Sequence, residues 1–341
     1  MKIKKAVTFR ASSIGDCLMG KYFLENVHAA YPKAKCAMVV GSRSAMIRDL
    51  CVAYPWLEII EVNRRNPVSI MRLLWQWWNS DLVLTQYAGK EGGRFSLASK
   101  YIGRLLACRG GFIGFADTFP WNKYLYDKIL QFSRNAAPAM LERQALSELT
   151  IPIAFPTPSL SFSQDTSLLQ RIGVQSGRYA VVHLFAGNKG RGLAPKNQRA
   201  LLSAFHEQLP GLTLLVSGGE QDEVQAEEVC KGIPDTRNIA GGTSLQEMLQ
   251  IIDSAAGVVS VDTGMAHIAA QLKKPLIVLC SCLGLHWWQE EQYGRKTSLQ
   301  IFTFTEPNGH VFKEYPDCLN NIDMKNAARA AQNLFSSTTF S

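Results

Sequence analysis

The chain has 341 residues, of which 47% are hydrophobic, and its formal net charge is +8. This length exceeds one ordinary hydrophobic core and predicts two domains of roughly 150 to 170 residues each. The longest apolar runs fall short of the roughly 20 residues that cross a bilayer, and the start MKIKKAVTFR lacks the apolar stretch of a secretory signal. The eight cysteines form no compact disulfide framework. We therefore expect a soluble cytoplasmic protein with reduced thiols.

The positive charge is unevenly spread. Residues 1–165 hold 21 Lys and Arg against 12 Asp and Glu, whereas residues 166–341 hold 15 against 16. A basic first half predicts an anionic partner for that half. Its basic residues are dispersed and no nucleic-acid-binding motif accompanies them. We therefore expect an acidic glycolipid or a membrane surface as the partner, and no nucleic acid.

Short apolar runs alternate with amphipathic stretches along the chain, which predicts βα units and parallel sheets. The expected strands are residues 5–10, 35–40, 58–62 and 81–86 in the first half, and 179–185, 212–218, 256–261 and 275–280 in the second. The segment IPIAFPTPSLSFSQD at 151–165 is the expected interdomain linker, because proline interrupts helices and central strands. Ligands of parallel α/β domains bind at the carboxyl ends of strands, so we expect the chemistry in the loops that follow them.

The first such loop is FRASSIGDCLMGKYFLENVHAAYP at 9–32. A strand gives way to a turn of small residues and then to a helix that is expected to begin near Asp16. A carboxylate at this place either complements the positive end of the helix dipole or serves as a catalytic base. Both interpretations remain open from the residues alone.

The second loop is VVSVDTGMAHIAAQLKKPLIVL at 258–279. Asp262 follows the strand, and a helix is expected to start within 263–265. A helix N-terminus offers unpaired N–H groups that hold phosphate, Gly264 allows a ligand close to the backbone, and Thr263 adds a hydroxyl donor. His267 lies near enough to reach the same ligand. The alternative is that Asp262 caps the helix and His267 is a surface histidine.

These residues carry a resemblance to a known family. VDTGMAHIAAQLKKPLIVL resembles the D-T-G-x-x-H-x-A-A-x-x-x-K-P signature of glycosyltransferase family 9, the ADP-heptose:lipopolysaccharide heptosyltransferases. RASSIGDCLMGKYFLENVHAAYP is similar to the N-terminal motif of that family. LLVSGGEQDEVQAEEV followed by NIAGGTSLQEMLQIIDSAAGVVSVDTG follows the family order as well. The resemblance covers most of residues 5–280.

The resemblance implies an α/β GT-B fold, in which two Rossmann-like domains face each other across a cleft. It implies an acceptor domain at 1–155 and a nucleotide-sugar domain at 156–322, and it allows a closing segment at 323–341 to pack back on the first domain. The implied reaction is an inverting transfer of heptose from ADP-heptose to an anionic inner-core acceptor of lipopolysaccharide. Asp16 would be the general base. The residues implied in donor binding are Asp262, Thr263, Gly264, Met265 and His267.

The loop AGNKGRGLAPKNQ at 186–198 departs from the family pattern G-A-x(n)-K-x-W-P, in which the lysine contacts the donor phosphate. Besides Gly187, the candidates for this contact are Arg191, then Lys189, then Lys196, and each is open to being a solvated loop charge. The sequence contains no Asp-x-Asp pair, so we expect protein donors to stabilise the leaving group, with no metal and no cofactor.

The charge of the first half predicts salt-sensitive, peripheral association with the inner face of the cytoplasmic membrane through arginines among Arg43, Arg48, Arg64, Arg65, Arg94, Arg104 and Arg109.

Two further motifs have competing interpretations. One is a candidate metal site made of Cys280, Cys282 and His286, with Cys318 as a fourth candidate ligand. Because no second closely spaced pair of ligands completes such a site, we interpret these residues as buried thiols and a neighbouring histidine. LLWQWWNSD at 73–81 is expected to be core aromatic packing, with an aromatic face towards lipid or sugar as the alternative.

Three other functions are alternatives to the heptosyltransferase hypothesis. The first is a GT-B transferase that uses another nucleotide sugar or a non-lipid acceptor. The second is a nucleotide-binding module without catalytic activity. The third, a dinucleotide oxidoreductase, is disfavoured because no G-x-G-x-x-G follows any expected strand.

Overall fold

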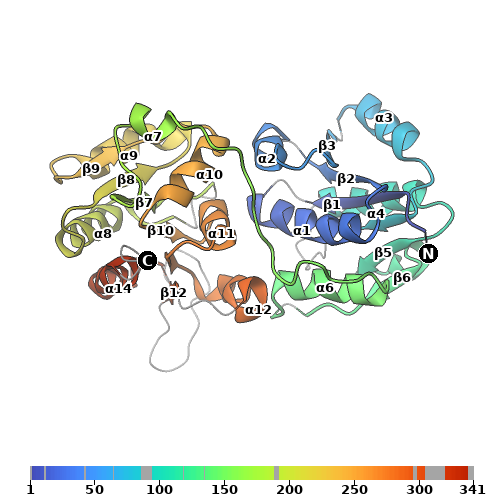
Figure 1. Ribbon diagram of the computed structural model, residues 1–341. Helices are drawn as coiled ribbons and strands as arrows, with labels where there is room; N and C mark the ends of the chain where they lie inside the picture. The colour runs from blue at the N-terminus through green and yellow to red at the C-terminus, as the bar shows by residue number, and fades with distance from the viewer. Residues whose placement is uncertain are drawn as a thin grey trace, which may run out of the picture. The chain divides into compact units, whose positions relative to one another are not determined.

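The computed structural model describes residues 2–10, 13–41, 44–63, 65–85, 94–117, 119–133, 135–187, 192–294, 298–303 and 319–336. The chain divides into two compact units, Met1–Pro158 and Ser159–Ser341, which we describe one at a time (Figure 1). The division falls inside the proline-rich and serine-rich segment 151–165. Within the described ranges, no helix combines the length and apolar character that crossing a bilayer requires.

The first unit is a parallel sheet of six strands with helices on both faces. The strands are arranged in the order β3-β2-β1-β4-β5-β6, so the chain reverses its direction of travel across the sheet between β1 and β4. Its elements are β1 (Lys5–Arg10), α1 (Ile14–Ala30), β2 (Lys35–Val40), α2 (Ser44–Cys51), β3 (Leu57–Glu61), α3 (Pro67–Trp77), β4 (Leu82–Leu84), α4 (Arg94–Leu106), β5 (Phe112–Phe115), α5 (Asn122–Leu125), β6 (Lys128–Leu130) and α6 (Pro138–Glu148).

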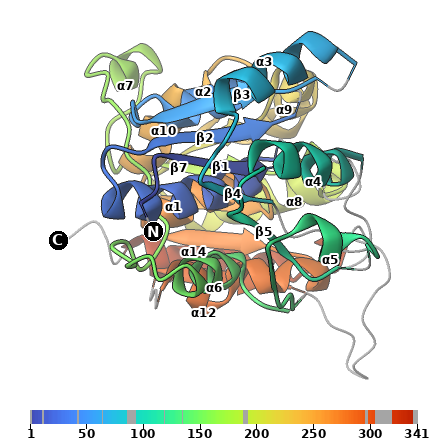
Figure 2. The same ribbon diagram turned by 90° about the vertical axis from the view of Figure 1, so that its right-hand side faces the viewer.

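Alternate side chains of β1 point to opposite faces of the first sheet. Val7 and Phe9 belong to a hydrophobic cluster that contains Trp77 of α3. Arg10 lies on the other face, where Gly20 of α1 makes room for it, because a Cβ at Gly20 would collide with the Arg10 side chain. Figure 2 shows the same division, with α1 and α6 on one side of the sheet and α3 and α4 on the other.

The second unit repeats this architecture. Its six parallel strands have the order β12-β11-β10-β7-β8-β9, which is the order of the first sheet, and its direction reverses between β7 and β10. The elements are α7 (Leu168–Arg171), β7 (Tyr179–His183), α8 (Pro195–Gln208), β8 (Thr213–Ser217), the 3₁₀ helix η2 (Glu220–Asp222), α9 (Glu223–Cys230), β9 (Thr236–Asn238), α10 (Leu245–Ser254), β10 (Gly257–Val261), α11 (Gly264–Gln271), β11 (Leu276–Leu279), the 3₁₀ helix η3 (Cys282–Trp288), α12 (Glu290–Tyr293), β12 (Leu299–Phe302) and α14 (Met324–Ser336).

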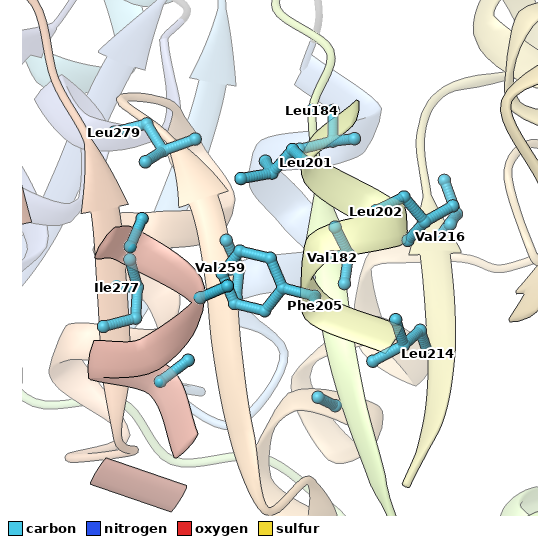
Figure 3. Packing of buried hydrophobic residues seen from close by; sticks show 14 of the residues in the cluster. Val182, Leu184, Leu201, Leu202, Phe205, Leu214, Val216, Val259, Ile277 and Leu279 are labelled. Atoms are coloured by element: carbon cyan, nitrogen blue, oxygen red, sulfur yellow. The ribbon is translucent and has the colours of Figure 1, made fainter. Parts of the chain in front are cut away.

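The core of the second unit lies between its sheet and the helices α8 and α14. Figure 3 shows Phe205 of α8 against Val182 and Val259 of the two central strands. The ring of Phe335 in α14 occupies the space where a side chain at Gly257 would stand. Within the closing segment, Met324–Ser336 forms α14, which packs on α8 and on the sheet of its own unit.

The expected α/β class with two Rossmann-like units is confirmed. The eight expected strands are present as β1 to β4, β7, β8, β10 and β11, with small differences at their ends. The sequence reading missed β5, β6, β9 and β12, which are only three or four residues long. Length alone does not explain this, because β4 and β11 are equally short and were predicted; β6, β9 and β12 lack the run of buried apolar residues that marks those two strands.

Candidate functional site

The loop that follows β10 lies where the direction of the second sheet reverses, which is the usual ligand-binding edge of such sheets. Asp262 directly follows β10, and α11 begins at Gly264, within the expected range. Its N-cap is Thr263, and not Asp262 as in the alternative interpretation. Thr263, Gly264 and Met265 are all partly exposed. The Thr263 hydroxyl lies 3.3 Å from the Ser260 hydroxyl and makes no capping hydrogen bond to the helix. The loop therefore presents a carboxylate, a hydroxyl and the positive end of a helix at one place.

Residues of η3 contact the carboxylate of Asp262 and fix its orientation. The indole Nε1–H of Trp288 donates a hydrogen bond of 3.1 Å to Asp262 Oδ1. Gly284 brings its backbone so close that a side chain there would overlap with Asp262 Oδ2. The orientation of this carboxylate therefore depends on residues more than 20 positions further along the chain.

His267 lies in the interior, so it is not the surface histidine of the alternative interpretation. Its ring stacks on Trp288, with 4.6 Å between the ring centroids and an interplanar angle of 1°. Its Nδ1 lies 2.6 Å from the Tyr293 hydroxyl, and its Nε2 lies 3.8 Å from Asp262 Oδ1. Burial lowers the pKa of His267 to about 3, so the ring is neutral near pH 7 and its contact with Asp262 is not an ion pair.

Trp288 and Tyr293, which the sequence reading did not assign, thus support the loop. Burial raises the pKa of Tyr293, which keeps its hydroxyl protonated. The signal for both was the aromatic run HWWQEEQY after β11. Since aromatic runs are usual in protein cores, that run alone did not indicate which loop it would contact.

A second histidine, also missed, lies at the carboxyl end of β7. His183 pairs in register with Ser260 of β10 and with Ser217 of β8, and its Nδ1 lies 3.1 Å from the Ser217 hydroxyl. Burial lowers the pKa of His183 to about 4, so this ring is neutral as well. His183, Ser217 and Ser260 therefore form a row of uncharged polar residues across β7, β8 and β10, near the carboxyl ends of these strands.

The basic loop after β7 is only partly described. Gly187 is exposed in a bend, and Lys196 is exposed in the first turn of α8. Lys189 and Arg191, the preferred candidates for the phosphate contact, lie outside the described residues.

The proposed thiol cluster is also only partly described. Cys280 is buried and donates to the Ser281 carbonyl, whereas the Cys282 side chain and Cys318 lie outside the described part. Among the residues that the structure does describe, no three His, Cys, Asp or Glu side chains group as metal ligands.

In the first unit, Asp16 occupies the first turn of α1, next to the carboxyl end of β1. The helix starts at Ile14, slightly before the expected position, because Ser13 caps it. The Ser13 hydroxyl donates a 2.6 Å hydrogen bond to Asp16 Oδ2, and its oxygen lies 3.4 Å from the Asp16 amide nitrogen, which donates to it. Asp16 is partly exposed and is held in one orientation at the positive end of the helix.

A buried ion pair lies behind Asp16. Arg10 Nη2 lies 2.6 Å from Glu142 Oε1 of α6, with side-chain exposures of 1% and 0%. Arg10 Nε and Glu142 Oε2 make no hydrogen bond. Burial above all, with a smaller contribution from the Asp16 carboxylate, raises the pKa of Glu142 to about 7, although Arg10 acts to lower it. Asp16 is therefore coupled electrostatically to a buried pair that the sequence reading missed.

Comparison with known proteins gives this geometry a context. The model of glycosyltransferase family 9 (heptosyltransferase) matches residues 153–281. Lipooligosaccharide heptosyltransferase 2 of Haemophilus influenzae is 35% identical over 74 residues, and the match spans 20% of this chain and only 21% of that relative. A family 9 glycosyl transferase from Veillonella parvula superposes with a TM-score of 0.75 at 14% identity, covering 99% of both chains. The ADP-heptose lps heptosyltransferase II of E. coli superposes with a TM-score of 0.71 at 16% identity, covering 99% of this chain and 100% of the other.

Proposed function

Since residues 153–281 match the model of glycosyltransferase family 9 (heptosyltransferase), we propose that the chain is a heptosyltransferase that moves a heptose from ADP-heptose to an anionic inner-core acceptor of lipopolysaccharide. One observation carries this proposal. The loop of Asp262, Thr263 and Gly264 lies at the ligand-binding edge of the second sheet, inside the segment that matches the family. The nucleotide sugar is a substrate, and the proposal includes no cofactor.

The loop suits a nucleotide sugar because it offers two kinds of contact. The first N–H groups of α11 and the Thr263 hydroxyl suit the negatively charged diphosphate. The Asp262 carboxylate suits sugar hydroxyls, which donate hydrogen bonds to it, and it would repel phosphate. Gly264 and Met265 flank these groups on the partly exposed side of the loop. In this proposal His267 supports the donor loop indirectly, because it contacts Trp288 and Tyr293, and Trp288 in turn orients Asp262.

The reaction in this proposal is a single displacement. The acceptor hydroxyl loses its proton to the Asp16 carboxylate while its oxygen forms a bond to the anomeric carbon of the heptose. The bond from that carbon to the diphosphate oxygen breaks, and ADP leaves with the bonding electrons. One displacement inverts the configuration at the anomeric carbon. Stabilisation of the leaving diphosphate is assigned to protein donors such as Arg191 or Lys189 with Gly187, and not to a metal ion.

The role of Asp262 leads to a prediction about binding. Replacing Asp262 by alanine should weaken ADP-heptose binding by roughly 10-fold to 100-fold, because a carboxylate that accepts sugar hydroxyls is lost. ADP alone lacks those hydroxyls and should bind the variant as well as it binds the wild type. Isothermal titration calorimetry with both ligands measures the difference. Equal weakening of ADP and ADP-heptose would mean that Asp262 only supports the start of α11.

Trp288→Phe is the matched variant for this experiment. It keeps an aromatic ring against His267 but removes the indole N–H that orients Asp262. We expect it to weaken ADP-heptose binding in the same direction as Asp262→Ala and by a smaller factor.

A transfer assay tests the function itself. The purified protein should convert an inner-core acceptor to a product heavier by one heptose when ADP-heptose is supplied, as read by mass spectrometry. We expect excess EDTA to leave the rate nearly unchanged. Complete loss of transfer in EDTA that Mg²⁺ or Mn²⁺ restores would overturn metal independence. Binding of ADP without any transfer would favour an inactive nucleotide-binding module, and transfer from another nucleotide sugar would favour another GT-B transferase.

We assign acceptor binding and contact with the membrane to the basic first unit. Its net positive charge fits phosphorylated or carboxylated inner-core sugars, and it fits peripheral contact with the inner face of the cytoplasmic membrane. Of the arginines considered for this contact, Arg48, Arg65 and Arg109 are described, and Arg104 pairs with Asp127. Arg43, Arg64 and the side chain of Arg94 lie outside the described residues.

A further inference from the structure

Among the described residues, the first unit exposes more large apolar side chains than the second. Of the large hydrophobic side chains that the structure describes as exposed, 14 lie in the first unit, whereas Val224 and Ile301 are the two in the second. Nine of the 14 lie on or beside three helices: Val68, Met71, Trp75, Trp78, Leu97, Tyr101, Leu105, Trp121 and Tyr124. These helices are α3, α4 and α5, and they follow one side of the first unit in Figure 2. Clustered exposed apolar side chains indicate an interaction surface.

Helix α3 has two separate apolar stripes. Successive helical residues turn by about 100°. One stripe covers the sheet, with Leu73 and Trp77 buried. The other consists of Val68, Met71 and Trp75 on the helix and continues to Trp78 at its end, and we call these four residues the outer stripe. Trp75 is 85% exposed, so the outer stripe takes no part in the hydrophobic core of the unit.

Positive charge flanks the outer stripe. Arg65 precedes α3 and Arg72 follows Met71 on the helix, and both side chains are exposed. Among the described residues, no acidic side chain forms an ion pair with either arginine. Glu58 accepts hydrogen bonds from Gln76, which lies one turn after Arg72 on the same flank of α3.

We infer that the outer stripe of α3 inserts into the interfacial region of a bilayer that contains anionic phospholipid. Tryptophan and methionine next to arginine suit the boundary between headgroups and acyl chains, where the ring is buried and the cation meets lipid phosphate. A second copy of the chain is a poorer occupant. Two outer stripes in a two-fold contact would bring Arg65 and Arg72 of each copy near those of the other, and the like charges would repel.

This surface changes the kind of membrane contact that the charge alone predicts. Contact through arginines alone is screened away by salt, since the Debye length falls from about 10 Å at 0.1 M to about 3 Å at 1 M. Burial of apolar side chains is not weakened in this way. The inference therefore predicts two components of binding, of which the arginines carry the salt-sensitive one and the outer stripe carries the salt-resistant one.

Co-sedimentation with vesicles tests the inference without donor or acceptor. The full chain should bind vesicles of phosphatidylcholine mixed with phosphatidylglycerol, and high salt should remove only part of this binding. Met71→Ser/Trp75→Ser should lower the affinity at least roughly tenfold and remove the salt-resistant part, because each side chain that is buried in the interface contributes to binding. Arg65→Gln/Arg72→Gln should lower only the salt-sensitive part.

Val224→Ser is the matched control, because Val224 is a similarly exposed apolar residue on α9 of the second unit. It should bind as the wild type does. Wild-type binding by the double serine variant, or equal loss in Val224→Ser, would overturn the inference. A wild-type dimer in gel filtration that the double serine variant converts to a monomer would overturn it as well, in favour of contact between copies.

The outcome is separable from the proposed function. Transfer of heptose to a soluble, deacylated acceptor should be the same for the wild type and for Met71→Ser/Trp75→Ser, because the outer stripe contributes to neither proposed substrate site. Intact transfer together with failed vesicle binding would reject the membrane surface and leave the enzyme assignment standing. Vesicle binding without transfer would support the membrane surface and reject the enzyme assignment.

Discussion

Asp16→Asn is expected to lower the turnover of heptose transfer by at least ~100-fold, because the amide cannot take the proton of the acceptor hydroxyl. The change keeps the size of the side chain, and a side-chain oxygen can still accept the hydrogen bond that Ser13 donates. The start of α1 should therefore be preserved. Donor affinity should stay close to that of the wild type, since the donor is assigned to the second unit. Steady-state kinetics with calorimetry of ADP-heptose measures both quantities.

Ser13→Ala is the informative companion of this variant. It leaves the base in place but removes the hydroxyl that orients Asp16 and caps the helix. We expect a smaller loss of turnover and a loss of about 1 kcal/mol of stability from the missing cap. Wild-type turnover in Asp16→Asn would leave Asp16 with a capping role only, and the base would have to be sought elsewhere.

Glu142→Leu is expected to reduce the free energy of unfolding by roughly 3 to 5 kcal/mol, because Arg10 would be left as a buried cation without its partner. Replacing both partners, as in Arg10→Met/Glu142→Leu, should restore most of that loss, since buried ion pairs are often replaceable by apolar residues. Urea denaturation of the two single variants and the double variant gives the coupling energy. Additive losses would show that the two side chains do not act as a pair.

The same pair predicts a dependence of stability on pH. The pKa of Glu142 is about 7 in the fold, above its usual value of about 4.5, so the folded chain holds this proton more tightly than the unfolded chain does. The contribution of Glu142 to stability is therefore fully present below about pH 4.5 and is lost as the pH rises through about 7. Glu142→Gln keeps an acceptor for Arg10 and cannot ionise, so it should fold and should lack this dependence. An identical pH dependence in the wild type and in Glu142→Gln would contradict the raised pKa.

The strands and the loop after β10 were predictable because their signals are local. Runs such as KAVTFR and AGVVSV are apolar, lie between turns, and became β1 and β10 with little change. The change from strand to Asp262, Thr263 and Gly264 correctly located the start of α11. The position of an element depends here on neighbouring residues, which a single sequence displays.

The support of the site was not predictable, because it joins residues that are distant in sequence. Arg10 and Glu142 are 132 positions apart, and both appear in the sequence as ordinary charged residues. A signal did exist for Glu142, which lies on the apolar side of PAMLERQALSE together with Ala139, Ala145 and Leu146. A charged residue at a core position of a helix indicates a buried partner but does not identify it.

The aromatic segment at 73–81 is core packing only in part. Trp77 is core packing, whereas Trp75 and Trp78 are exposed. The helical period separates them, because neighbours one or two positions apart point in different directions. Composition alone could not divide the run in this way.

Each unit completes its sheet from one uninterrupted stretch of chain, and α14 adds its side chains to the core of the half that precedes it. During synthesis, the first half is therefore able to fold as soon as it leaves the ribosome, before the strands of the second half exist. An exchange of whole halves between related genes, with a crossover near Pro158, would leave both cores intact. Under the proposed function, such an exchange would change the acceptor preference or the donor preference without the other.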